Sequence, residues 1–149
     1  NNLDLFEEMD TCAKIHKLQA GNPAAMPAKQ VFMLATLGGA KALGLEEQIG
    51  SLERGKRGDV VLIDLSAPEL TPLYDVYSQL VYAIKGGHVE TVVVDGRVIV
   101  EGREVQTVDT TVVVAKSRAI QAKILSALAE FRAERAAKKK AAAAKKGSD

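Results

Sequence analysis

Apolar residues recur at helical spacing at the start of the chain and predict a first helix over residues 3–19. Its apolar stripe is Leu5, Met9, Cys12 and His16, with Phe6 and Ala13 beside it. Asp4 and Glu7 have the spacing of a capping box, and Gly21-Asn22-Pro23 ends the helix. Because His16 lies among apolar positions, we interpret it as a packed structural histidine rather than a ligand.

A second helical pattern begins near Pro27, a residue type suited to a first helical position, and ends at Gly44. Its apolar face is Val31, Leu34, Ala35, Ala40 and Leu43. Gly38-Gly39 interrupts this segment, and we interpret the pair as a close packing point or a break between two short helices. A phosphate-binding role is disfavoured, because no strand precedes the glycines.

The middle of the chain changes to a β pattern. We predict a short strand over 50–52, a turn over 53–56 and a strand over 59–64, whose four consecutive apolar residues indicate burial on both faces. Residues 80–84 fit a short helix or a strand. A hairpin is predicted from 91–94 and 97–100 around Asp95-Gly96, followed by a second turn over 101–103 and a continuing strand at 104–105. A helix follows Asp109 and runs at least to Arg135.

This order, helices then hairpins then a helix, does not match a repeating βαβ pattern. The 149 residues carry 20 basic and 19 acidic side chains. The lone Cys12 excludes a disulfide framework, and two histidines are too few for a His/Cys zinc cluster. Apolar runs are far shorter than a membrane span, and no charged-then-apolar leader opens the chain, so we expect a cytoplasmic protein with no membrane partner.

The charge is uneven along the chain. Residues 129–149 contain seven Lys/Arg and three Asp/Glu, and residues 136–149 form a Lys/Ala-rich tail. We interpret the tail as a solvated end of the last helix. The alternative is a weak electrostatic patch for nucleic acid or anionic lipid, although nucleic acid is disfavoured because no aromatic residue follows Phe131.

Several polar residues are candidate site residues, and we expect a structural role for each. Asp59 and Asp64 fall on opposite faces of an ideal strand, which suits turn or edge roles better than paired catalysis. Adjacent Glu7 and Glu8 point apart on a helix. The remaining expectations are a solvated turn at Lys56-Arg57, an exposed loop histidine at His88, and helix capping by Asn1 or Asn2, with substrate contact as the alternative for the asparagines.

Two motifs carry a resemblance to a known family. Residues 49–64 read IGSLERGKRGDVVLID and resemble the segment that follows the barrel in the amidohydrolase superfamily, with Gly58 where alanine is usual. Residues 92–100 read VVVDGRVIV and resemble the closing hairpin of the same superfamily.

Further segments narrow the resemblance to the branch of methylthioadenosine/S-adenosylhomocysteine deaminases and triazine-type chlorohydrolases. They are NNLDLFEEM at 1–9, ATLGGA at 35–40, ALGL at 42–45, LTPLYD at 70–75 and LVYA at 80–83. Gln79 stands where that branch often has histidine, and the Lys/Ala tail lies outside the pattern.

The resemblance implies the fold class of an α/β fragment, α+β as it stands. Residues 1–48 are expected to be the last helices of a metal-dependent (β/α)₈ barrel, and 49–108 the C-terminal part of a composite β-sandwich. Residues 109–135 are then a C-terminal helix and 136–149 the tail. A whole barrel needs about 200–250 residues, more than this chain has.

The resemblance also implies a metal, usually zinc, whose last ligand in the family lies a few residues before the Asn-Asn pair. No catalytic, cofactor-binding or metal-binding residue of the family is therefore assigned to this chain. Its expected partners are a small N-heterocyclic substrate for the whole enzyme and the remainder of the barrel, in cis or in trans. A homo-oligomer is compatible with the family.

Three functions remain open at this point. The leading one is the C-terminal portion of a metal-dependent aminohydrolase, inactive alone. The second is a separately encoded non-catalytic subunit or remnant that binds a partner chain. The third is a small module whose basic tail binds nucleic acid.

Overall fold

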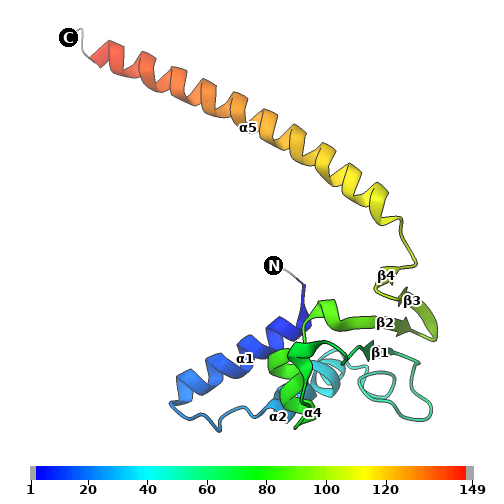
Figure 1. Cartoon of the computed structure of the whole chain (residues 1–149). Coiled ribbons are helices and arrows are strands. Elements are labelled where there is room, and N and C mark those ends of the chain that lie inside the picture. Colours follow the sequence, from blue (N-terminus) through cyan, green and yellow to red (C-terminus); the bar gives the residue numbers. More distant parts are fainter. Residues whose placement is uncertain (1–2, 147–149) are drawn as a thin grey trace. The chain divides into compact units, whose positions relative to one another are not determined.

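The computed structural model describes residues 3–146, with side chains through residue 138. The chain divides into two compact units, Asn1–Thr107 and Val108–Asp149. The first unit contains a layer of short helices and a small antiparallel sheet, and the second is a single helix (Figure 1).

Helix α1 (Leu5–Ala20) confirms the first predicted helix, although it begins two residues later and ends one residue later than predicted. Asp4 is its N-cap, and its carboxylate accepts a hydrogen bond from the backbone N–H of Phe6. Gly21 ends the helix in the left-handed conformation, with φ +58°. The buried face differs from the expected stripe, because Met9 and Ala13 are buried while His16 is exposed. The packed role expected for His16 is therefore wrong in this unit, where α2 and η3 pack against α1.

The second helical pattern is broken into three pieces. Helix α2 (Ala28–Met33) begins after Pro27, a π-helical segment η1 (Leu34–Gly38) follows, and α3 (Gly39–Ala42) completes the run. The glycine pair thus lies at the junction of η1 and α3, in agreement with the expected break. A Cβ on Gly38 would lie 3.3 Å from the carbonyl oxygen of Met33, so this glycine also sits at a close approach.

Four short helical segments lie between residues 63 and 89. They are η2 (Pro68–Leu70), α4 (Val76–Ser78), η3 (Gln79–Ala83) and η4 (Gly86–His88). Residues 80–84, which fitted a helix or a strand, are thus largely π-helical. Asp75 caps α4, and its hydrogen bonds from the Ser78 side chain and backbone N–H lower the pKa of the Asp75 carboxyl.

The sheet has four antiparallel strands in the order β1-β2-β3-β4. Their bounds are β1 Val60–Ile63, β2 Val89–Val94, β3 Arg97–Glu101 and β4 Glu104–Val105. Asp95 and Gly96 both have positive φ, +50° and +74°, as the predicted tight turn between β2 and β3 requires.

Two strand predictions are wrong. Residues 50–52 form no strand, since Gly50 has φ +92° and the segment bends over the helices. A Cβ on Gly50 would meet that of Ala40 at 2.8 Å, so close helix packing determines this backbone. In β1, burial on both faces is also not found, because Val61 and Leu62 are about half exposed.

The core of the first unit lies between α1, α2 and η3. Its buried members are Met9, Ala13, Ala28, Val31 and Val81. Partly buried side chains surround them, among which Phe32 and Tyr77 pack with ring centroids 5.7 Å apart. This cluster fixes the helices and leaves the other side of the helical layer facing the sheet region.

The second unit contains helix α5 (Thr110–Lys146), which confirms the predicted last helix and continues through the Lys/Ala-rich residues. The carboxylate of Asp109 accepts hydrogen bonds from the backbone N–H groups of Thr111 and Val112 at its start. None of the helices in the described part of the chain combines the length and the hydropathy that a membrane span requires.

Candidate functional site

The two aspartates that flank β1 have structural partners. Asp59 accepts a hydrogen bond from the backbone N–H of Asp95 at 2.7 Å and so ties β1 to the β2–β3 turn. Asp64 accepts from the backbone N–H of Ser66 at 2.9 Å and from Nη2 of Arg103 at 2.7 Å. Hydrogen bonds from Ser66, then from Arg103, hold the pKa of the Asp64 carboxyl well below its usual range. The turn and edge roles expected for both residues are confirmed.

His88 is not the exposed loop histidine that the sequence predicted. Its side chain retains only 16% exposure. The backbone N–H of Lys85 donates to Nδ1 at 3.0 Å, which leaves Nε2 as the protonated nitrogen of the neutral ring. Nε2 lies 3.2 Å from Oε1 of Glu69, and the pKa of Glu69 is lowered by a backbone hydrogen bond and then by His88. The ring thus joins two loops that sequence spacing does not relate.

The solvated turn predicted at Lys56-Arg57 is confirmed for Arg57 and wrong for Lys56. The Lys56 side chain is 12% exposed and donates to Oγ of Ser51 at 2.7 Å. The Ser51 hydroxyl and then the Lys56 charge lower the pKa of the Glu53 carboxyl. Arg57 is exposed and donates to the side chain of Gln48 at 2.9 Å.

The other candidate residues that the structure describes do not form a site. Glu7 and Glu8 are exposed in the first turn of α1, and Cys12 is a partly buried free thiol. Asn1 and Asn2 lie outside the described residues. Across residues 3–146, no group of three or more His, Cys, Asp or Glu side chains is placed to hold a metal ion. The residues described here therefore do not fit the zinc site that the family resemblance implies.

The first unit contains an apolar concave surface. It has a volume of about 850 Å³ and lies among α1, η1, the 49–52 segment, β1 and β2. Its apolar lining includes Leu5, Phe32, Leu37, Leu52, Val61 and Val92. Several of these side chains are strongly exposed, with Leu5 at 56% and Leu52 at 74%. We call this surface the apolar concavity.

The polar groups on this surface are already engaged elsewhere. Thr36 Oγ1 donates to the carbonyl oxygen of Phe32, while Asp59 and Arg57 have the partners described above. Small-molecule sites usually combine an apolar lining with a few convergent polar groups. The apolar concavity lacks such a set among its described residues, and it is better suited to packing against another apolar surface.

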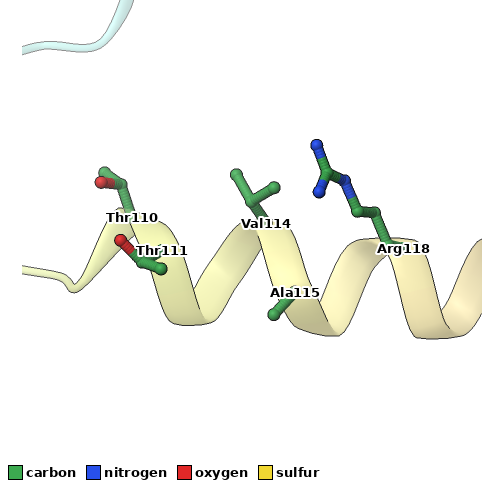
Figure 2. Close-up of a pocket in the computed structure, with 5 residues that line it drawn as sticks. All are labelled: Thr110, Thr111, Val114, Ala115 and Arg118. Carbon is green, nitrogen blue, oxygen red and sulfur yellow. The ribbon is translucent and has the colours of Figure 1, made fainter.

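A smaller hollow of about 360 Å³ lies on α5 and is formed by one helix alone (Figure 2). Its side chains are Thr110, Thr111, Val114, Ala115 and Arg118. Figure 2 shows them spread along successive turns without a common focus. This hollow has neither the depth nor the grouped chemistry of a binding site.

One polar feature went unpredicted, the loop Lys85–His88 between η3 and β2. Its Gly86 N–H donates to Oδ2 of Asp4 at 3.1 Å, while its Gly87 carbonyl accepts from Nε of Arg103 at 3.2 Å. The only sequence signal for this loop is the Gly86-Gly87 pair, which marks a turn but not its partners.

Comparison with known proteins identifies the family of this chain. The model of the amidohydrolase family matches residues 1–99. The chain belongs to the amidohydrolase family. A 5'-deoxyadenosine deaminase from Methanosarcina acetivorans is 48% identical over 118 residues, which cover 79% of this chain and 27% of that protein. A 5-methylthioadenosine/S-adenosylhomocysteine deaminase from Syntrophobacter fumaroxidans is 45% identical over 120 residues, 80% of this chain and 27% of the relative.

Solved amidohydrolase-type structures agree with the fold. A zinc-bound adenosine deaminase from Xanthomonas campestris matches with a TM-score of 0.79 and 40% identity over 82% of this chain and 28% of that one. A zinc-bound atrazine chlorohydrolase from Arthrobacter aurescens matches with a TM-score of 0.68 and 25% identity over 76% of this chain and 25% of that one. These findings confirm the resemblance to the deaminase and chlorohydrolase branch. The chain spans little more than a quarter of the length of these relatives.

Proposed function

We propose that this chain is the C-terminal portion of a metal-dependent aminohydrolase that removes ammonia from an adenosine-like or other N-heterocyclic substrate. The names of the relatives at 45–48% identity support the reaction class. The portion described here completes the fold, and the residues that hold the metal and transfer protons belong to the rest of the enzyme.

The observation that carries this proposal is the apolar concavity. Burying apolar surface stabilises a protein by roughly 25 cal/mol per Å², and large exposed apolar patches mark surfaces that bind another part. Leu5, Leu52 and Val61 expose half or more of their surface on one concave face. The remaining three quarters of an amidohydrolase would supply the covering surface.

Under this proposal the parts of the chain have separate roles. Residues 1–48 supply the last helices of the (β/α)₈ barrel, and residues 49–108 supply the C-terminal share of a β-sandwich. Hydrogen bonds made by the Lys85–His88 loop connect these two parts. Residues 109–135 are the C-terminal helix and 136–149 the Lys/Ala-rich tail.

The test is to isolate the protein from its source with an antibody against the 91–105 hairpin and to measure its intact mass. Because 118 residues make up 27% of the Methanosarcina acetivorans relative, that relative has about 440 residues, roughly three times this chain. We expect a mass near that multiple of 15.9 kDa. We also expect ammonia release from 5'-deoxyadenosine or 5-methylthioadenosine that a chelator abolishes and zinc restores.

Other outcomes separate the alternatives. A mass of 15.9 kDa with a co-purifying chain would favour a separately encoded subunit instead. Chloride release from atrazine without ammonia release would replace deamination by dechlorination. A full-length protein with neither activity would contradict the proposal.

A further inference from the structure

The N-cap of α1 uses both of its carboxylate oxygens. Oδ1 of Asp4 accepts from the backbone N–H of Phe6 at 2.9 Å, which is the ordinary work of a helix cap. Oδ2 accepts from the backbone N–H of Gly86 at 3.1 Å, from a loop 82 residues further along the chain. Serine, threonine or asparagine would serve equally well as a cap alone. The second oxygen is what an aspartate adds at this position.

The residue opposite Asp4 is fitted to this contact. A Cβ on Gly86 would lie 3.1 Å from Oδ2 of Asp4, closer than Cβ atoms normally approach another heavy atom. A Cβ on the neighbouring Gly87 would meet nothing within 4 Å. A side chain at position 86 would therefore press on the carboxylate, whereas one at position 87 would not.

The same loop is held from the sheet side. The backbone N–H of Asp64, just after β1, donates to the His88 carbonyl oxygen at 2.9 Å. Nε of Arg103, in the β3–β4 turn, donates to the Gly87 carbonyl oxygen at 3.2 Å, and Nη2 of Arg103 bonds Asp64. Gly86, Gly87 and His88 therefore connect the first turn of α1 to two points on the sheet.

We propose that Asp4 is a positioning residue, which through Gly86 fixes the start of α1 against the sheet and so orients the catalytic end of the enzyme. This rests on the proposed function and on the family resemblance, which implies that the last metal ligand lies a few residues before the Asn1-Asn2 pair and so close to the start of α1. A displacement of about 1 Å at reacting groups costs about 100-fold in rate. A contact that sets the start of this helix therefore acts on turnover as well as on stability.

The experiment compares Asp4→Asn, Gly86→Ala and Gly87→Ala in the full-length enzyme. Asparagine caps helices as well as aspartate does, but its one acceptor oxygen can take the position of Oδ1, which faces Phe6, or of Oδ2, which faces Gly86, and not both. We expect Asp4→Asn to lower kcat about tenfold with unchanged KM and zinc content. We expect the Gly86 amide to exchange its hydrogen about tenfold faster. Gly86→Ala should lower kcat in the same way, and Gly87→Ala should match the wild type.

Each readout has a result that overturns the proposal. If Asp4→Asn lowers only the denaturation midpoint and leaves kcat unchanged, Asp4 is a structural cap and nothing more. If the exchange of the Gly86 amide is unchanged in Asp4→Asn, the contact does not hold the loop. A wild-type enzyme that releases no ammonia would overturn the proposed function and with it the positioning role in catalysis. Faster exchange of the Gly86 amide in Asp4→Asn would then still show that the contact between Asp4 and Gly86 exists.

Discussion

The two apolar surfaces of the helical layer are built from the same kinds of side chain but differ in burial. On one side, Val31 and Val81 lie between α1, α2 and η3 with 2% and no exposure. On the other side, Leu5 and Leu52 line the apolar concavity and remain more than half exposed. Residue type therefore does not decide burial here. What decides it is whether this chain also carries the covering element.

The comparison predicts a paired effect in the full-length protein, the largest that we expect. Val81→Ala should lower the free energy of unfolding by about 2 kcal/mol, because it removes buried methyl groups and leaves a cavity. Leu5→Ala should lower it by about 2 kcal/mol or more, because under the proposed function the rest of the enzyme covers that side chain. Both values would be measured by denaturant unfolding monitored by circular dichroism.

A matched control on the same helix is Gln19→Ala, at an exposed position outside the apolar concavity, for which we expect a change within about 0.5 kcal/mol. A Leu5→Ala variant that unfolds like this control would show that the concavity stays open to solvent. The comparison between the two surfaces would then fail.

A smaller effect concerns the polar contacts at the edge of the sheet. The pKa of Asp64 is lowered in the folded state, so the folded protein binds this proton less tightly than the unfolded chain does. Its stabilising contribution is complete above the unfolded value of 3.8 and is lost progressively as the pH falls below it. We expect Asp64→Asn to be less stable than the wild type at pH 7, with the difference narrowing below about pH 4.

The measurement for this prediction is the midpoint of urea unfolding of both proteins at pH 7, 5 and 3. The exposed carboxyl of Glu101 provides a control, and Glu101→Gln should follow the wild type at all three values. A difference between Asp64→Asn and the wild type that stays constant down to pH 3 would count against the Arg103 and Ser66 contacts.

Much of the secondary structure was predictable because its signals are local. Asp4 and Gly21 bound α1, and Asp95-Gly96 with positive φ makes the β2–β3 turn. These features depend on residues within a few positions of each other. The strand expected at 50–52 failed because Gly50 packs on Ala40, a contact with a neighbouring helix that no local pattern encodes.

The polar contacts were less predictable, because their partners lie far apart in the sequence. His88 was expected to be exposed, and its partner Glu69 lies 19 residues away. The contact between Asp4 and Gly86 spans 82 residues. The four apolar residues of β1 predicted burial of both faces, whereas Val61 and Leu62 are exposed. A local pattern does not show which segment covers a strand.

The most direct test of the central claim is thiol labelling of the full-length protein, in a Cys12→Ser background with other thiols removed. Leu52→Cys reports on the apolar concavity, and Ala24→Cys reports on an exposed turn outside it. We predict that Ala24→Cys reacts rapidly with a water-soluble maleimide while Leu52→Cys reacts only after denaturation. Equal and rapid labelling at both positions would contradict the claim that the rest of an amidohydrolase covers this surface.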